Sequence, residues 1–316
     1  SRWRLVSDIA RFLEGGSACT ADPEQPPNQY VIRRMPETQA FSAPRSRWTP
    51  PSGTLGELVQ ASYSRALALL AHEDALLAAA QSAPPTPSFR EALLRPTVGI
   101  IAEVKRRSPS KGSINPNLDA VSRARSYADA GAAAVSVLTE PERFGGSVAD
   151  LRAVAGGVPI PVLRKDFIVA PVQLHEARAN GAAAALLIAR ALSIPALPEL
   201  VEAGREIGLD LLVEVRDARE LQRALDAGAT IIGVNNRNLE SLEIDPGTVG
   251  RILPLIPRNV VAIAESGMSS REDVQRAARS GADAVLIGSA VSAVEDANAI
   301  VRSLTGVIVG RDARPD

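Results

Sequence analysis

Lysine is the charged residue that this chain almost lacks: only Lys105, Lys111 and Lys165 occur among 35 basic residues, and all the others are arginine. Lysine differs from arginine because it can release its proton at accessible pH and acts as a compact point charge. Lys105 and Lys165 also each end an apolar run that is typical of a buried strand. These two lysines are therefore candidates for proton transfer.

Further absences exclude whole classes of function. A net charge of -1 lacks the basic excess that binding to nucleic acid usually requires. The single cysteine, Cys19, excludes an intrachain disulfide and a cysteine-rich metal cluster, and it indicates a reducing compartment, which we expect to be the cytoplasm or, in a photosynthetic eukaryote, the plastid stroma. No apolar run is long enough to span a bilayer, since residues 66–80 are broken by His72, Glu73 and Asp74. No P-loop, HExxH, CxxC or GxSxG motif occurs.

The chain is long enough for one large α/β domain with extra elements. Its first segment is rich in Pro, Arg and Ser, holds Trp3 and Trp48, and favours loop or extended structure. In residues 54–81 the apolar residues recur at helical spacing, which predicts one long amphipathic helix that packs on the main domain. We expect an irregular arm over residues 1–52, the main domain with its preceding helix over 53–310, and a tail over 311–316.

After Pro96 one pattern repeats: a helix, a Gly-Ala signal, and a short apolar run that ends in a polar residue. It occurs in DAGAAAVSVLTE, ANGAAAALLIAR, DAGATIIGVNN and RSGADAVLIGS, and four more runs are VGIIAEV, IPVLRKD, DLLVEVR and NVVAIAES. Uniformly apolar runs are typical of parallel strands covered on both faces. The eight predicted strands lie near residues 98–105, 134–138, 160–164, 184–188, 211–215, 230–234, 260–264 and 284–287.

Eight strands that alternate with helices over about 200 residues predict an α/β fold of the (β/α)8 TIM-barrel type. The alternative is a doubly wound open sheet. It is disfavoured because the repeat number is eight and no Gly-rich dinucleotide fingerprint follows the first strand.

Polar residues follow the predicted strands, and in a barrel these ends converge on one mouth. They are Glu103, Lys105, Thr139, Glu140, Lys165, Asp166, Arg190, Glu214, Asn235, Arg237, Glu265, Ser266, Gly288 and Ser289. Because residues two apart on a strand face the same side, Glu103 and Lys105 should point into the interior together. A structural salt bridge at the rim explains that pair equally well, but Lys165 and Glu214 at neighbouring ends favour catalysis. Asp166 is expected only to orient Lys165 or to cap the next helix.

His72 and His175 fall on predicted helices, away from every strand end. They are most simply surface or packing residues. We therefore expect neither a histidine-based mechanism nor a metal site.

The last two strand ends carry a separate signal, AESGM and LIGSA. They place small residues and backbone N–H groups where many barrels hold a substrate phosphate. Gly267 and Gly288 lack the Cβ that would block a close approach. Gly-Ser also simply caps helices, so the position in the barrel is what favours phosphate binding.

Seven segments together are similar to the indole-3-glycerol phosphate synthase family of tryptophan biosynthesis. In order they are IIAEVKRRSPSKGSI, VLTEPERFGGS, PVLRKDFIV, LLVEVRD, GVNNRNLESLEID, IAESGM and VLIGSA. The resemblance covers roughly residues 53–310, and NQYVIRRMPETQ in the arm resembles the N-terminal extension of cyanobacterial and plastid members. It implies a carboxy-lyase that converts 1-(2-carboxyphenylamino)-1-deoxyribulose 5-phosphate to indole-3-glycerol phosphate, CO2 and water, without a cofactor.

The resemblance also implies roles for the residues at the strand ends. Lys165 would be the acid at the carbonyl oxygen and Glu214 the base, while Lys105 would orient the substrate and could supply the second proton. The remaining matches are Glu103, Asn235 and Glu265 for the sugar hydroxyls and the tuning of the lysines; Ser108 and Arg237 for the anthranilate carboxylate; Pro109, Phe144, Phe167, Leu239 and Leu242 for the apolar walls; and Ser266, Gly267, Gly288 and Ser289 for the phosphate.

Some features depart from the family pattern or stay open. Ala170 replaces a common Asp and Ala184 stands where GADAV is common, both away from the expected site. The loop from Lys111 to Ser113 is expected to move over the substrate, and Lys111 could equally be a solvated loop charge. The expected partner is a small phosphorylated substrate, with no nucleic acid or membrane, and contact with other enzymes of the tryptophan pathway is left open.

Three rival functions compete with this assignment. The first is a class I aldolase or sugar-phosphate isomerase that would form a Schiff base on Lys165. Phosphoribosylanthranilate isomerase is disfavoured because it relies on a cysteine at a strand end, whereas Cys19 lies far upstream. A non-catalytic barrel that binds a partner through the arm would have lost charged residues, yet every expected one is present.

Overall fold

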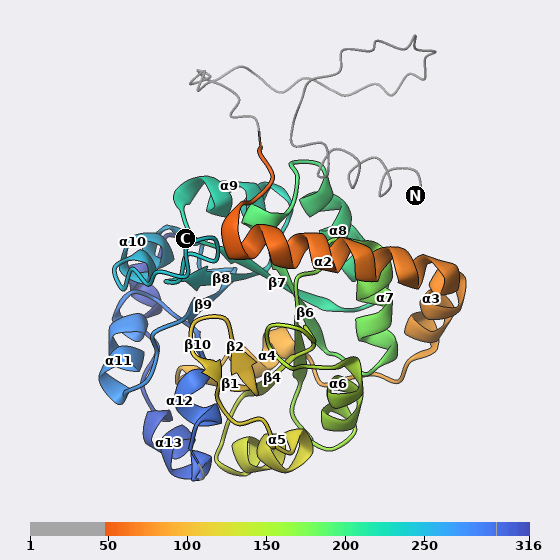
Figure 1. The fold of residues 1–316 in the computed structure, drawn as a ribbon. Helices are drawn as coiled ribbons and strands as arrows, with labels where there is room; N and C mark the ends of the chain where they lie inside the picture. Colours follow the sequence, from red (N-terminus) through yellow and green to blue (C-terminus); the bar gives the residue numbers. More distant parts are fainter. Residues whose placement is uncertain (1–47, 295) are drawn as a thin grey trace, which may run out of the picture. The chain divides into compact units, whose positions relative to one another are not determined.

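A computed structural model describes residues 48–294 and 296–316 (Figure 1). The predicted arm, residues 1–52, falls almost entirely outside these residues, so the division of the chain at its N-terminus stays a prediction. Residues 51–316 form one compact unit. In the described part of the chain, no helix is long and apolar enough to cross a membrane.

The centre of this unit is a closed barrel of parallel strands in the order β1-β10-β9-β8-β7-β6-β5-β4. The strands are β1 (Gly99–Val104), β4 (Ala134–Leu138), β5 (Val162–Lys165), β6 (Ala184–Ile188), β7 (Asp210–Val215), β8 (Ile231–Asn235), β9 (Val261–Glu265) and β10 (Ala284–Ile287). Almost every residue in them is buried, which is the cause of their uniformly apolar sequences. The predicted (β/α)8 barrel is confirmed.

Helices surround the barrel and cover its strands (Figure 1). They are α4 (Phe89–Leu93), α5 (Ala120–Asp129), α6 (Val148–Ala155), α7 (Pro171–Ala179), α8 (Ala196–Glu206), α9 (Ala218–Asp226), α10 (Thr248–Ile252), α11 (Arg271–Arg279), α12 (Ser289–Ser292) and α13 (Ala297–Leu304), with short 3₁₀ turns η2 (Ala189–Ala191), η3 (Leu253–Leu255) and η4 (Arg311–Ala313). Four helices end at the glycines of the repeat, each in the left-handed region: Gly131, Gly181, Gly228 and Gly281. A residue with a Cβ adopts this conformation at a cost, so glycine lets the chain turn directly from helix to strand.

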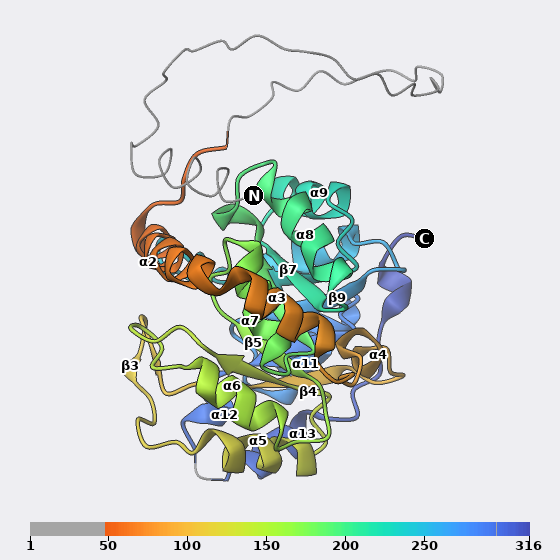
Figure 2. The same ribbon diagram turned by 90° about the vertical axis from the view of Figure 1, so that its right-hand side faces the viewer.

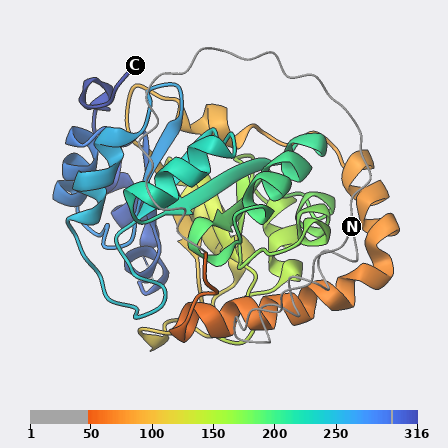
Figure 3. The same cartoon turned by 90° about the horizontal axis from the view of Figure 1, so that it is seen from above.

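The segment before the barrel is not one continuous helix, so that prediction was wrong in part. Helix α2 (Gly53–Leu69) is followed by the 3₁₀ turn η1 (Leu70–His72) and then by α3 (Glu73–Ser82). Figure 3 shows the change of direction between the two helices. The first helix buries Leu58 and Val59, whereas α3 packs along α7 and buries only Ala80 completely. The turn lets one amphipathic stretch follow a curved surface.

An extra hairpin follows β1 and was not expected from the sequence. Its strands, β2 (Arg107–Ser108) and β3 (Gly112–Ser113), are antiparallel. Gly112 has φ +66°, so the tight turn at Lys111 depends on a residue without a Cβ. Figure 2 shows the hairpin on the same side of the barrel as the start of α2.

Candidate active site

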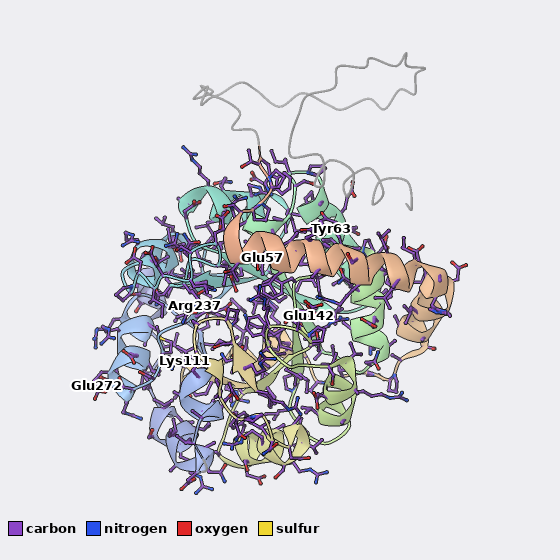
Figure 4. All side chains as sticks on the ribbon, viewed as in Figure 1. Glu57, Tyr63, Lys111, Glu142, Arg237 and Glu272 are labelled. Carbon is purple, nitrogen blue, oxygen red and sulfur yellow. The ribbon has the colours of Figure 1, made fainter. Side chains whose placement is uncertain are left out.

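The carboxyl ends of the strands surround a cavity of about 440 Å³. All but one of the predicted site residues line it: Glu103, Lys105, Ser108, Pro109, Phe144, Lys165, Phe167, Asn235, Arg237, Leu239, Leu242, Glu265, Ser266, Gly267, Gly288 and Ser289. The exception is Glu214, whose side chain lies behind Lys165 and Asn235 and lines a smaller cavity. In Figure 4, Arg237 and Lys111 lie around the mouth of the barrel, with Glu57 on the helix above them.

Lys165 lies between two buried carboxylates at the end of β5. Its Nζ is 3.6 Å from Oε2 of Glu265 on β9 and 3.7 Å from Oε2 of Glu214 on β7. Both carboxylates are almost fully buried. Among the described residues, one oxygen of each accepts no hydrogen bond, namely Oε2 of Glu214 and Oε1 of Glu265. Buried polar atoms are rarely left without partners, so these oxygens are suited to bind substrate groups or protons.

Lys105 and Glu103 form the second pair, as predicted from their spacing. The Nζ of Lys105 donates to Oε1 of Glu103 over 2.5 Å, and both side chains are largely buried. Tyr127 and Ser292 donate hydrogen bonds to the Glu103 carbonyl oxygen, so the end of β1 is held in place from outside the barrel. The Lys105 ammonium therefore has a fixed position beside the cavity.

Burial and mutual attraction together set the charges in this cluster. Burial opposes the charged form of Lys165, but Glu265, Glu214 and Glu103 outweigh it and raise the pKa of the ammonium well above its usual range. Burial also opposes ionisation of Glu103, yet Lys105 and Lys165 hold the pKa of that carboxyl below its usual value. For Glu265, burial dominates the pull of Lys165 and, with repulsion from Glu214, raises the pKa to about 8. At neutral pH the cluster thus holds the Lys165 ammonium, an ionised Glu103 and a Glu265 carboxyl group that retains its proton.

Glycine in β8 makes room for the Glu265 side chain. A Cβ on Gly233 would lie 2.1 Å from Oε1 of Glu265, which is an impossible contact. Gly288 has the same relation to the other pair, because its Cβ would lie 2.3 Å from Oε1 of Glu103 and 2.6 Å from Nζ of Lys105. The sequence predicts a role for Gly288 in phosphate approach, and in the structure its missing Cβ also leaves room for the ion pair. A glycine inside an apolar strand, such as Gly233, is the sequence feature that indicates such a close contact.

Asn235 connects the base candidate to the loop after β8. Its Nδ2 donates to Oε1 of Glu214 over 2.9 Å, and its Oδ1 accepts from the backbone N–H of Arg237 over 2.8 Å. Arg237 Nη1 in turn donates to the carbonyl oxygen of Leu242 over 2.7 Å. Leu242 has φ +66°, an unfavourable backbone conformation for a branched residue, and its side chain lines the cavity. The free-energy cost of this backbone conformation is consistent with a functional position.

Two phenylalanines form an aromatic wall. The rings of Phe144 and Phe167 have centroids 5.9 Å apart and are inclined at 38°. The Glu140 carboxylate accepts from the backbone N–H groups of Glu142, Arg143 and Phe144, which fixes the loop that carries the first ring. An aromatic substrate can therefore be held between rigid rings.

At the opposite side of the mouth, Ser266 and Gly267 both have positive φ, +62° and +78°. A Cβ on Gly267 would meet nothing closer than 3.9 Å, so the space beside its backbone is open. Gly288 precedes the short helix α12. This part of the cavity offers backbone N–H groups and two serines, Ser266 and Ser289, which are groups suited to an anionic ligand.

Four predicted strand-end residues bind other groups of the protein, and three of them, Thr139, Glu140 and Arg190, do not line the substrate cavity. Thr139 donates to Asp166 over 2.6 Å, and Arg190 pairs with Glu240 over 2.9 Å. Asp166 reaches the cavity wall but neither orients Lys165 nor caps α7. Its carboxylate pairs instead with Arg65 over 2.8 Å and Arg164 over 3.2 Å.

The cap of α7 comes from Gln173, not from the N-cap residue. Its Oε1 accepts from the backbone N–H groups of Val169 and Ala170, and its Nε2 donates to Ser62 on α2. The family departure at Ala170 is therefore compensated locally. Ser62 also donates to the carbonyl oxygen of Phe167, so this helix supports the aromatic wall.

The sequence missed several lining residues because they are apolar or lie outside the repeat. They include Thr54, Leu58, Leu138, Leu186, Ile188, Ile244, Met268 and Leu286. Thr54 and Leu58 come from α2, which shows that this helix forms part of the cavity wall. Only a pattern of buried residues at the start of a helix could have indicated this. The described residues contain no group of His, Cys, Asp and Glu that could hold a metal.

The chain is similar in sequence to one family over most of its length. A family model described as indole-3-glycerol phosphate synthase matches residues 59–304. The protein of that name from Rhodococcus jostii (strain RHA1) is 49% identical over 230 residues, which are 73% of this chain and 86% of that protein. The one from Nocardioides sp. (strain ATCC BAA-499 / JS614) is 52% identical over 223 residues, 71% of this chain and 84% of that protein.

Solved structures share the fold at much lower identity. The 3-hexulose-6-phosphate synthase of Salmonella typhimurium is 16% identical, with a TM-score of 0.54, and covers 66% of this chain and 96% of its own. Thiamine phosphate pyrophosphorylase from Pyrococcus furiosus is 15% identical, with a TM-score of 0.51 and coverage of 66% and 93%. These likenesses support the barrel and carry no statement about activity.

Proposed function

The chain belongs to the indole-3-glycerol phosphate synthase family, and we propose that its cavity closes the indole ring in the following way. The enzyme acts in tryptophan biosynthesis as a carboxy-lyase and takes a phosphorylated substrate. That substrate is 1-(2-carboxyphenylamino)-1-deoxyribulose 5-phosphate. The observation that carries the proposal is the Lys165 ammonium, held 3.6 Å and 3.7 Å from two buried carboxylates at the end of the cavity.

Positioning comes first, because an aromatic carbon must meet a ketone. Phe144 and Phe167 hold the anthranilate ring, and Arg237 with Ser108 binds its carboxylate. Pro109, Leu239 and Leu242 complete the apolar wall. Ser266, Gly267, Gly288 and Ser289 bind the phosphate at the other side of the mouth. A substrate fixed at both ends has its reacting carbons held close together, which supplies the proximity contribution to catalysis.

Ring closure requires positive charge at the ketone. As the aromatic carbon attacks the carbonyl carbon, the C=O bond electrons move to oxygen, and Lys165 donates a proton there. Loss of the carboxylate as CO2 leaves its electron pair in the ring and restores aromaticity. The new hydroxyl then takes a second proton, from Lys105 or Lys165, and departs as water, while Glu214 removes the proton from the adjacent carbon.

Three polar residues support these groups. Asn235 fixes Glu214 by its hydrogen bond of 2.9 Å, and Glu103 fixes Lys105 over 2.5 Å. Glu265, with its raised pKa, can present either a donor or an acceptor to the sugar hydroxyls.

We expect the loop from Lys111 to Ser113 to close over the bound substrate. A cytoplasmic location and contact with other tryptophan-pathway enzymes remain predictions, which cell fractionation and co-purification would test.

The charge on Lys165 weighs against the Schiff-base alternative. A Schiff base needs a free amine, but the neighbouring carboxylates raise the pKa of Lys165. The decisive experiment is a fluorescence assay of indole product formation with the purified chain and the carboxyphenylamino substrate. Turnover without added cofactor supports the proposal. Covalent trapping of a keto-sugar phosphate on Lys165 by borohydride, with no indole product, would replace it with aldolase chemistry.

A further inference from the structure

A second cavity, here called the rear cavity, has a volume of about 160 Å³, shares the wall residues Ile188, Arg237 and Leu239 with the first, and has no part in the proposed reaction. Its polar wall comes from Arg190, Glu214, Arg216, Asp217, Glu220 and Glu240. Glu214 lines this rear cavity and does not line the substrate cavity. The base of the reaction therefore lies between Lys165, which lines the substrate cavity, and the rear cavity. A polar cavity of this size has room for several water molecules.

The reaction stoichiometry creates a need for protons. Starting from the ionised carboxylate, two protons are donated, one to the carbonyl oxygen and one to the leaving hydroxyl, while Glu214 gains one. Release of CO2 changes no proton count. The cluster of lysines and carboxylates is thus one proton short after each turnover, and the product blocks the front.

Glu220, at the start of α9, is placed to supply that proton. Its Oε2 accepts from the backbone N–H of Arg216 over 2.8 Å, and the residue lines the rear cavity and is partly exposed to solvent. Burial, with repulsion from Asp217 and Glu214, raises the pKa of Glu220 to about 7. It can therefore both hold and release a proton near neutral pH.

The charged groups around Glu220 come from every neighbouring element. Arg190 follows β6, Glu214 lies on β7, and Arg216 and Asp217 lie in the turn after β7. Arg223 lies on α9, the helix that carries Glu220, and Arg237 and Glu240 lie in the loop after β8. Arg190 and Glu240 pair with each other over 2.9 Å. Arg223 donates to the carbonyl oxygens of Ala189 and Leu192.

We propose that Glu220 passes a proton through water in the rear cavity to Glu214, and so restores the starting charge of the catalytic cluster after each turnover. Glu214 first gives the proton that it took from the substrate carbon to Lys165, whose Nζ is 3.7 Å from its Oε2. The O–H bond of Glu220 then breaks, a proton moves along the water, and a new O–H bond forms on Oε2 of Glu214, which has no hydrogen-bond donor among the described residues. This second proton also leaves through Lys165, so both donated protons are replaced and Glu214 is again a carboxylate. Glu220 then regains a proton from solvent. The inference rests on the proposed function and adds a positioning residue to it.

The test is Glu220→Gln, which keeps an oxygen to accept the Arg216 N–H but cannot release a proton. Rapid mixing with the carboxyphenylamino substrate, followed by indole fluorescence, separates the first turnover from later ones. The first turnover should keep its rate, because Lys165 starts protonated, while steady-state kcat falls about 10-fold and a burst appears. Imidazole buffer should restore kcat in Glu220→Ala, because a small acid can enter the enlarged cavity.

The matched control is Asp217→Asn, which removes a carboxylate from the same wall and can still cap α9. It keeps the Glu220 carboxyl group, so it should show no burst at slightly acidic pH, and because repulsion from Asp217 helps to raise the pKa of Glu220, its kcat should begin to fall at a lower pH than that of the wild type. Equal loss of the first and later turnovers in Glu220→Gln would indicate a structural role and overturn the relay. Unchanged kcat would overturn it as well. A wild-type chain that forms no indole product would contradict the proposed function itself, and this is measured first.

Discussion

The two ends of the barrel bury charge in different ways. At the carboxyl ends of the strands, Lys165 is 3.6 Å and 3.7 Å from carboxylates that keep an oxygen without a hydrogen bond from the described residues. At the opposite end, Arg314 donates to Asp283 over 2.8 Å and to the carbonyl oxygen of Val260 over 2.8 Å, and both charged side chains are fully buried. Asp283 also accepts from the Ala262 N–H.

This difference fits the chemistry of the cation at each end. Arginine is used where a buried charge must be held in one state, because its planar group stays protonated and makes several directed hydrogen bonds. Lysine is kept where a proton has to move. The comparison can be tested by exchanging or removing the cation at each end.

The largest effect is expected for Lys165→Arg. The positive charge remains, but the guanidinium is larger and cannot give up its proton, so kcat should fall about 1000-fold, and Lys165→Ala should abolish product formation. Product fluorescence measures the activity, and circular dichroism with thermal melting shows whether the fold is kept. A folded Lys165→Arg protein with nearly full activity would show that charge alone is needed.

Removal of the arginine at the other end should affect stability and leave the chemistry intact. Arg314→Met leaves Asp283 buried without its cation, which should lower the free energy of unfolding by about 3–5 kcal/mol. Urea titration measures the loss, and kcat at a temperature where the variant is folded should not change. The control is Arg205→Met, whose exposed pair with Glu202 should contribute less than about 1 kcal/mol. Similar losses for the two variants would contradict the difference between the ends.

A smaller effect is expected where glycine makes room for the catalytic pairs. Gly288→Ala forces Glu103 and Lys105 apart, so kcat should fall about 10-fold to 100-fold with little change in melting temperature. Gly250→Ala is the matched control, because a Cβ there meets no atom within 4 Å. If both variants keep full activity, the Glu103–Lys105 contact is not needed for catalysis.

The last test concerns the pH dependence of stability, where the change between neighbouring pH values is small. The pKa of Glu265 is raised from 4.5 to about 8, so its proton stabilises the folded state below pH 4.5, and this contribution is lost as pH rises towards 8. The free energy of unfolding of the wild type should therefore fall, as the pH rises, by up to about 1.4 kcal/mol per pH unit relative to that of Glu265→Gln, whose side chain cannot ionise. Urea titrations at several pH values would show it. Parallel curves for the two proteins would exclude a raised pKa.

The repeat made the barrel predictable, but the directions of individual side chains were not. The eight strands lie within two residues of their predicted positions because buried parallel strands need apolar runs of fixed length. Glu103 and Lys105 were paired correctly because strand periodicity determines which side a residue faces. The direction in which a long side chain points depends on three-dimensional neighbours. Asp166 turns to Arg164 and Arg65, and Glu214 lines the rear cavity, for this reason.

The helix before the barrel shows the same limit. Its apolar spacing continues through residues 70–72, where the structure has a 3₁₀ turn, because the curvature of the surface underneath is not encoded in the spacing. The contribution of Thr54 and Leu58 to the cavity wall was missed for a similar reason. Packing against a distant strand end leaves no local signal.

The cavity wall joins the beginning of this helix to the end of the barrel, since Thr54 and Ala290 both line it. The backbone N–H of Thr54 is anchored to the Glu240 carbonyl oxygen over 3.2 Å, and Gly53 sits so close that a Cβ would lie 2.4 Å from that oxygen. During synthesis on the ribosome the helix emerges early and must wait for partners made much later. A nascent chain that stops before β10 therefore has no complete pocket, and activity can arise only after the segment through Ala290 has been synthesised.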